Sequence, residues 1–409
     1  MCSSDLMESL KQTKSETGQT ESLLDILKAN IGQYFMFIAL VVIMIFFTIT
    51  TNGVFISSRN ISNLINQMGY IAVLAVGMTL IIVIRHIDLS VGYLAGFLGA
   101  FSAIAMTFWG WSVYAVIPAV MIMGILAGML TATPVAKLGV PAFVSTMAAG
   151  LIFRGALLLV TMGTGTIVIK DPVFNAIGND YIPDINLGGF LPGKHKLTLI
   201  IGLIGIIFSI FSAVRSRQTK KSYNFQVPSF GLFVAQLVLI SALIGYVAWI
   251  LSGYNGISWS LVILLLVVAV FQFITTKTPL GRHIYAVGGN PEAAELSGIS
   301  VSRITYIVFG AMGLLSALSG IMYASRLRSA TTTAGLGFET DAIAAAFVGG
   351  VSAAGGVGTI TGSIIGALVM MSLTSGMNLM GIDISVQYIV RGAVLVLAVV
   401  FDRITRRNQ

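Results

Sequence analysis

Long apolar runs recur along almost the whole chain, and the polar segments between them are short. The run from 304 to 324, for example, contains no charged residue. The hydrocarbon core of a bilayer is about 30 Å thick, and an α-helix crosses it with roughly 20 apolar residues. Because backbone polar groups must be paired inside that core, we expect the runs to be helical. We predict twelve membrane elements, at residues 33–51, 67–84, 90–109, 112–131, 142–162, 198–214, 230–251, 257–275, 304–324, 340–352, 359–378 and 384–401.

The composition agrees with a chain that is solvated mostly by lipid. Charged residues make up 9% of the sequence and hydrophobic residues 56%, whereas a soluble domain carries about 25% charged residues. The 45 glycines favour helices that pack closely through small side chains. The predicted fold class is therefore an all-α integral membrane protein, a polytopic helical bundle of about 12 membrane elements. Some elements are expected to be broken or re-entrant, since 340–352 is short enough to be a half-helix.

The positive charges predict how the chain is oriented in the membrane. They collect at 215–221, 276–303 and 402–409, which an even number of spans places on one side. Loops rich in Lys and Arg stay in the cytoplasm, so we assign this side, with the N-terminal segment 1–32, to the cytoplasm. The segment 163–197 then forms an extracytoplasmic cap on the transmembrane domain 33–401. We attribute the net charge of +8 to the basic loops that orient the chain rather than to nucleic-acid binding. We therefore predict no nucleic-acid partner.

The cytoplasmic loop 276–303 contains the signals of a short helix. Asn290 is a good N-cap, and Pro291 follows at the first helical position, where its missing N–H costs nothing. Glu292 suits the first turn, and Gly298 supplies a left-handed stop. The predicted helix, Pro291 to Ser297, is too short to be stable alone in water. It must dock, either on the membrane domain itself or on a partner.

A second group of polar residues lies between two apolar spans. Arg85, His86 and Asp88 follow one another closely there. Charges inside a membrane are expensive and usually functional, so one interpretation is a broken helix that lines the path or closes a gate. The other is a tight loop in which Asp88 caps the next helix through the N–H groups of Ser90 and Val91.

Charged residues also occur within the later spans. Arg154 needs a partner, which Asp341 or Glu339 could supply, and Arg391 is expected to snorkel or to be paired. Our candidates for the translocation path or gate are Asp88, Ser90, Gly92, Arg154 and Asp341.

The sequence offers no catalytic constellation. Its three histidines, His86, His195 and His283, lie in separate polar places and form no metal-binding pair. Residues 188–195 have the spacing of a phosphate-binding loop, but His195 stands where a Ser or Thr would hold Mg²⁺. We therefore predict no catalytic residue, no metal site and no cofactor in this chain.

Several motifs resemble those of one family of bacterial permeases. They are Gly77–Leu80, Ile87–Gly92, Pro141–Thr146, Arg154-Gly155, Asp341–Ala345, Gly349–Gly358 and the whole of 279–300. Nearly the whole chain from residue 33 onward is similar to the membrane-spanning subunits of ATP-binding-cassette (ABC) importers for ribose, galactose and xylose. The resemblance implies a permease that forms the path for a monosaccharide and has no enzyme activity of its own.

The resemblance also implies partners. The segment 279–300 looks like the coupling loop of such importers, whose short helix sits in a cleft of the cytoplasmic ATPase. It assigns coupling to Gly289, Asn290, Pro291, Glu292, Ala293, Ala294, Leu296 and Gly298. Two ATPase domains would bind ATP and Mg, an extracytoplasmic sugar-binding protein would deliver the sugar, and a second permease copy would complete a homodimer. The expected location is the bacterial plasma (inner) membrane, with both termini cytoplasmic.

Extra length between 198 and 257 makes the chain more similar to some members of this family than to others. It adds two helices to the ten-span core of ribose-type chains, which resembles xylose-type and multiple-sugar permeases and favours a pentose such as xylose. Two alternatives stay open: an ion-coupled secondary transporter, and an ABC permease for another small solute. The loop from Asn290 to Gly298 discriminates against the first, because a secondary transporter does not require it.

Overall fold

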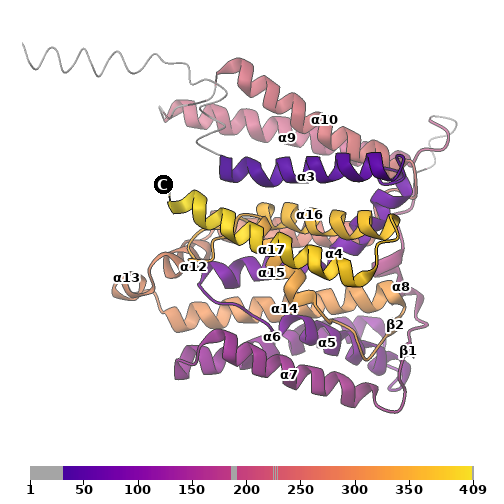
Figure 1. Cartoon of the computed structure of the whole chain (residues 1–409), viewed down its shortest axis with the longest axis vertical. Helices are drawn as coiled ribbons and strands as arrows, with labels where there is room; N and C mark the ends of the chain where they lie inside the picture. Colours follow the sequence, from indigo (N-terminus) through magenta and orange to yellow (C-terminus); the bar gives the residue numbers. More distant parts are fainter. Residues whose placement is uncertain (1–30, 186–190, 224, 226, 228, 408–409) are drawn as a thin grey trace, which may run out of the picture.

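The computed structural model describes residues 31–185, 191–223, 225, 227 and 229–407. The predicted N-terminal segment 1–32 lies, apart from its last two residues, outside this part. Figure 1 shows the arrangement, in which most helices run roughly parallel to one another. In chain order the elements are α3 Ile31–Thr50, α4 Ser58–Val83, α5 Val91–Thr107, α6 Val113–Leu138, α7 Ala142–Thr161, β1 Ile167–Val168, α8 Pro172–Asn179, α9 Lys196–Ser222, α10 Phe230–Ser252, α11 Trp259–Lys277, α12 Pro279–Gly289, α13 Pro291–Leu296, α14 Val301–Leu327, β2 Ser329–Ala330, α15 Phe338–Val348, α16 Ile360–Leu379 and α17 Ile384–Arg407.

The predicted fold class is confirmed. Within the described residues, 8 helices are long and apolar enough to cross a membrane, and α3, α5 and α17 contain shorter apolar stretches. The eleven-residue α15 is the predicted half-helix. Each of the twelve predicted membrane elements therefore corresponds to a helix, and the molecule is an all-α polytopic membrane protein.

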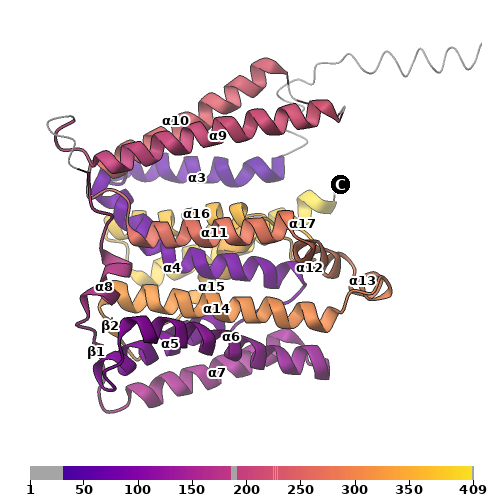
Figure 2. The ribbon, with the colours of Figure 1, turned by 180° about the vertical axis from the view of Figure 1, so that it is seen from behind.

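Close packing through glycine builds the core. The helix α14 lies between α4 on one side and α5 and α6 on the other (Figure 2). A Cβ atom added to Gly124 of α6 would lie 2.4 Å from the carbonyl oxygen of Gly313 in α14, and one added to Gly313 would lie 2.0 Å from the oxygen of Gly124. The two backbones are in contact at this point, so no larger residue fits, as expected for membrane helices held together by van der Waals packing.

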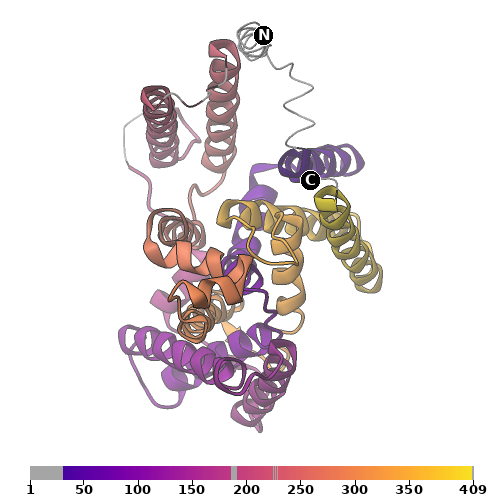
Figure 3. The ribbon, with the colours of Figure 1, turned by 90° about the vertical axis from the view of Figure 1, so that its left-hand side faces the viewer.

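The two inserted helices, α9 and α10, stand apart from the bundle. Only 6% of the most apolar stretch of each is buried, against 83% for α4. Figure 3 shows the rose-coloured pair beside the other helices rather than among them. Their contact with the bundle is at one end, where Ile250 and Leu251 pack on Ile61. Both long faces of the hairpin are therefore available to lipid.

Several boundaries differ from the prediction. The helix α4 begins at Ser58, where Ser57 caps it, rather than at 67. The basic loop 215–221 is the helical end of α9. The C-terminal tail is also helical, since α17 continues to Arg407. Polar ends of this kind extend beyond the bilayer core, which an apolar-run search does not detect.

The segment 163–197 contains elements that the sequence analysis missed. The strand β1 pairs with β2 in antiparallel register, and α8 is capped by Asp171, whose carboxylate accepts a bond from Phe174 N at 2.9 Å. The hydroxyl of Ser325, in α14, accepts a bond from Gly178 N at 2.7 Å. The pair Asp171-Pro172 is an N-cap signal like that of Asn290-Pro291 and could have located α8.

Candidate functional site

The predicted coupling helix is present as α13. The side chain of Asn290 accepts a hydrogen bond from Ala293 N at 3.0 Å, which pairs one of the free N–H groups of the first turn. Pro291 occupies the first helical position. The helix ends at Leu296, one residue before the predicted end. The local signals therefore located this element almost to the residue.

The stop after α13 has the predicted left-handed geometry. Gly298 has a φ of 82°. Its N–H donates to Glu295 O at 2.9 Å, and the next N–H, of Ile299, donates to Ala294 O at 3.0 Å. These two bonds form a Schellman motif, in which a side chain on the left-handed residue would be strained.

The two faces of α13 differ. Leu296 is 91% exposed, and Ala293 lies on the same exposed side. Ala294 is only 4% exposed and belongs to the main hydrophobic cluster of the membrane domain. Ala294 therefore holds α13 on its own chain, and the assignment of Ala294 to coupling stays a prediction. Figure 1 shows α13 projecting at one end of the molecule.

A helix that the sequence analysis missed leads into α13. The helix α12 begins after Thr278, whose hydroxyl accepts a bond from Gly281 N at 3.3 Å, and it ends at Gly289. Thr278-Pro279 repeats the N-cap and proline signal found at Asn290-Pro291. From α12, the Tyr285 hydroxyl donates to Gly358 O at 2.6 Å. The predicted coupling loop is thus attached to the glycine-rich segment before α16.

The chain turns between α4 and α5, as both interpretations expected, and Asp88 accepts the predicted bond from Ser90 N. Asp88 is 3% exposed, and its carboxylate accepts bonds from the N–H and the hydroxyl of Ser90, at 2.8 Å and 2.6 Å. The predicted bond to Val91 N is not among the contacts of Asp88. The carboxylate therefore organises the turn just before α5, which is a structural role at the break. A function as a gate stays a prediction.

The start of α5 lies against the segment before α15. A Cβ on Gly335 would lie 1.9 Å from Gly92 O, and a Cβ on Gly92 would lie 2.2 Å from an Oε2 of Glu339, in the first turn of α15. Nearby, the rings of Tyr70, Tyr323 and Phe338 pack on one another with centroids 4.9–5.2 Å apart. The sequence analysis named no functional aromatic residue, and periodicity alone gave no sign of this cluster.

The charged residues of the spans are paired differently from the prediction. Arg391 in α17 contacts both carboxylate oxygens of Asp341 at 3.4 Å, so Asp341 is not the partner of Arg154. The guanidinium of Arg154 lies over the ring of Tyr93, 5.5 Å from its centroid. The reason is topological: Arg154 is on α7, which packs on α5, whereas α15 packs on α17. The expectation that Arg391 is paired is confirmed.

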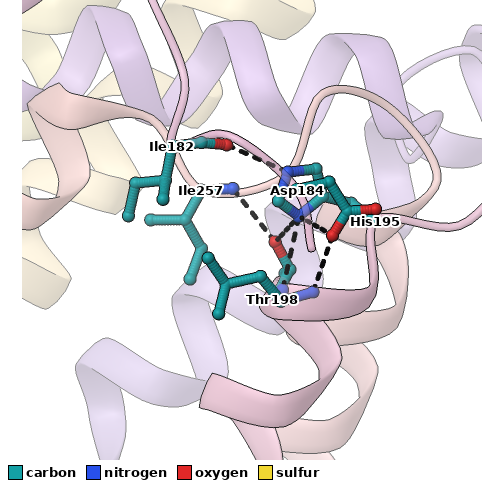
Figure 4. A network of polar contacts seen from close by, with 6 residues as sticks. Ile182, Asp184, His195, Thr198 and Ile257 are labelled. Carbon is teal, nitrogen blue, oxygen red and sulfur yellow. Dashed lines mark hydrogen bonds and ion pairs between the residues drawn. The ribbon is translucent and has the colours of Figure 1, made fainter. Parts of the chain in front are cut away.

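At the end of the molecule opposite α13, His195 connects the segment 163–197 to the inserted hairpin (Figure 4). Its Nε2 faces Ile182 O at 3.0 Å, while its Nδ1 accepts a bond from Thr198 N at 3.3 Å. The hydroxyl of Thr198 accepts a bond from Ile257 N at 3.2 Å and lies 2.9 Å from the same Nδ1. The imidazole of His195 therefore links Ile182 and Thr198, and Thr198 extends the network to Ile257.

This network gives His195 a structural role as the N-cap of α9. Asp184 adds to it, since its carboxylate accepts a bond from Leu197 N at 2.8 Å. That bond, and the neighbouring N–H groups and imidazole, lower the pKa of Asp184. The likeness of 188–195 to a phosphate-binding loop includes 188–190, which lie outside the described residues.

Comparison with known proteins identifies the family. The family described as the permease component of the branched-chain amino acid transport system matches residues 60–181 and 189–399. The chain belongs to this permease family. The matched ranges include both the coupling loop and the break between α4 and α5, so these parts belong to a transport permease.

Individual relatives cover nearly the whole chain. It is 39% identical to the xylose transport system permease protein of Escherichia coli (strain K12) over 379 residues, which is 93% of each chain. It is 37% identical to the protein of the same description from Haemophilus influenzae (strain ATCC 51907 / DSM 11121 / KW20 / Rd), over 93% of this chain and 98% of that one. A ribose import permease protein from the same strain is 34% identical, over 90% and 91%. No solved structure matches.

Proposed function

We propose that this chain is the membrane-spanning permease subunit of an ATP-driven importer, an ABC importer, for a monosaccharide such as xylose. The observation that carries the proposal is α13, a capped helix of 6 residues that presents Leu296, 91% exposed, at one end of a membrane protein. Relatives described as xylose transport system permeases cover the chain almost completely.

The exposed face of α13 is the proposed binding surface for a cytoplasmic ATPase domain. A large apolar side chain on a docked helix is unfavourable in water and favourable in a cleft. Ala293, next to Leu296 on that face, is small enough to let the helix backbone approach its partner. ATP and Mg would be bound by the ATPase alone. One chain supplies one such helix, so two ATPase domains require a second permease copy, and a two-fold homodimer is proposed.

The orientation follows from the arrangement of the charges. The end of α9 with Lys220 and Lys221, the end of α17 and the coupling helix α13 all lie at the same end of the molecule in Figure 1. We propose that this end faces the cytoplasm of a bacterial cell, with the chain in the inner membrane and both termini inside. The opposite end, with α8 and the β1–β2 pair, would receive a sugar-binding protein.

Reconstitution tests the proposal directly. The permease would be placed in liposomes with its ATPase and its sugar-binding protein, and uptake of labelled xylose would be measured with and without ATP. We expect uptake only with ATP, and no change when proton and sodium gradients are abolished by ionophores. Uptake driven by an ion gradient alone would establish the secondary transporter instead. ATP-driven uptake of ribose but not xylose would support the proposed importer and show that its substrate is ribose.

A further inference from the structure

Arg85 joins three segments that are far apart in sequence. It lies just after α4 and has a φ of 64°, in the left-handed region. Its N–H donates to Ile82 O at 2.9 Å and the N–H of His86 donates to Ile81 O at 3.0 Å, so Arg85 fills the position of a Schellman motif that glycine usually takes. A non-glycine residue there costs about 1 kcal/mol or more. The backbone signal alone would favour glycine, so the side chain must contribute something.

The side chain of Arg85 holds the carbonyl groups directly before the coupling helix. Its Nε donates to Gly288 O at 2.7 Å, and a terminal nitrogen donates to Gly289 O. These are carbonyls of the last turn of α12, which have no partner within that helix and attract a positive charge. Asn290, the N-cap of α13, is the next residue. The guanidinium therefore fixes the point at which α13 begins.

The backbones of the same segments are also in contact. A Cβ on Gly288 would lie 1.9 Å from Val83 O, the last residue of α4. The same carbonyl accepts a bond from Gly356 N at 2.9 Å. A Cβ on Gly355, which has a φ of 81°, would lie 2.3 Å from the Cγ of Arg85. The end of α4 is therefore in direct backbone contact with both α12, at Gly288, and the loop before α16, at Gly356.

This junction is continuous with the break in the membrane. Three residues after Arg85, Asp88 organises the turn that starts α5, and Ile87 O accepts a bond from Thr146 of α7 at 3.2 Å. The loop containing Gly356 starts α16, which packs on α15 and α4. A displacement of α13 would therefore also displace the α4–α5 break and the loop before α16, because these close contacts leave no space for local adjustment.

We propose that Arg85 is a positioning residue for transport, which transmits movement of the coupling helix to the α4–α5 break and to the loop before α16. The proposal rests on the proposed function, because it requires an ATPase that moves α13. Arg85 touches neither ATP nor sugar in this role. Loss of the Arg85 side chain should uncouple ATP hydrolysis from transport, while the permease still binds its ATPase and its sugar-binding protein.

Two substitutions at Arg85 distinguish this role from a general need for stability. Arg85→Gly removes both hydrogen bonds but relieves the left-handed backbone, which offsets part of the loss, so the protein should still fold and insert. Arg85→Lys keeps the charge near the end of α12 but has no fork to span two carbonyls. Arg282→Ala, at an exposed position of α12, is the control for loss of a positive charge in the same loop.

The experiment uses the reconstituted complex of permease, ATPase and sugar-binding protein, with xylose as the probe. Two quantities are measured: xylose uptake, and the ratio of ATP hydrolysis with and without sugar-loaded binding protein. In Arg85→Gly we expect both uptake and this ratio to fall about fivefold or more, as for loss of a typical coupling free energy. Arg85→Lys should recover part of the loss, and Arg282→Ala should behave as the wild type.

A wild-type ratio and uptake in Arg85→Gly would overturn the proposal. If that variant does not reach the membrane, Arg85→Lys decides in its place, and full uptake by Arg85→Lys counts against the role of the forked guanidinium. Failure of the proposed function is a different result, since the wild-type complex itself would then show no ATP-driven uptake.

Discussion

The two ends of this membrane protein are fastened in different ways. At the end with α13, backbones touch at glycines, and the side chains of Arg85 and Tyr285 add hydrogen bonds between the segments. At the other end α8 also touches α14 at Gly178, but most of the links are side chains that cap and cross-link the backbone. Ser325 holds α8, and His195 and Thr198 hold the base of the hairpin. Close glycine contacts leave no space for a larger side chain. In a network of hydrogen bonds, each bond contributes only part of the stability, so the loss of one is tolerated better. The first arrangement fits the proposed transmission of movement from α13, and the second fits the proposed binding surface for a sugar-binding protein.

The largest effect is expected at Gly288. In Gly288→Ala the new Cβ would lie 1.9 Å from Val83 O, so the end of α12 must move away from α4. Overpacking of this kind costs about 1–3 kcal/mol, and we expect transport to be lost with lower thermal stability. Gly289→Ala is the matched control, because a Cβ there meets nothing within 4 Å. Equal transport by the two variants would show that this contact is not tight in the working protein.

The next effect concerns the stop after α13. Gly298→Val places a β-branched residue at a φ of 82°, so the turn back to the membrane must change. A Cβ there meets nothing within 4 Å, and the variant should still insert. We expect transport and sugar-stimulated ATP hydrolysis to disappear, while Gly298→Asn, which tolerates the left-handed region, should retain most of both. Normal uptake by inserted Gly298→Val would remove the case for α13 as the coupling element.

A smaller effect is expected at the end with α8. Ser325→Ala removes the acceptor for Gly178 N and the donor to Phe174 O, both at 2.7 Å. Leaving buried polar groups unpaired costs about 1–3 kcal/mol, which a thermal unfolding measurement in detergent would detect. Because other bonds hold α8, transport should be reduced less than in Gly288→Ala. The reverse order would contradict the difference between the two ends. Ser329→Ala serves as the control, because the half-buried Ser329 hydroxyl donates locally, to Leu327 O at 3.2 Å.

The smallest effect is a dependence on pH through Asp184. Its folded-state pKa is lowered, chiefly by the bond from Leu197 N, so its contribution is present above the unfolded pKa and is lost as the pH falls through the folded value. Thermal unfolding of the wild type and of Asp184→Ala should therefore differ slightly near pH 7 and converge in acid. A difference that grows on acidification would show that the carboxylate does not act through this bond.

The sequence predicted those features whose signals are local. Asn290-Pro291 and Gly298 fix the ends of α13 through their own backbone preferences, and the structure confirms them to within one residue. The same type of signal at Thr278-Pro279 and Asp171-Pro172 was present but was outweighed by the interpretation of these segments as loops. The local signals were therefore sufficient to predict α12 and α8, but these segments were interpreted as loops.

Other features depend on tertiary packing and could not be predicted in this way. Nothing near Asp341 in the sequence shows that Arg391 rather than Arg154 lies within 3.4 Å, because the choice is made by which helices pack together. Likewise Gly288 and Gly289 are adjacent and identical, yet only the first lies against Val83. A single sequence indicates that glycines allow close approach, but it does not indicate which glycine makes the contact.

The two ends of the α9–α10 hairpin meet at its base. His195 N donates to Ser252 O at 2.8 Å, so the chain leaves the bundle and returns to it at nearly one point. A short connection could replace everything between these residues with little change in loop-closure entropy, since that entropy varies slowly with length. The hairpin is therefore a modular insertion, and chains with and without it can share the same helical core.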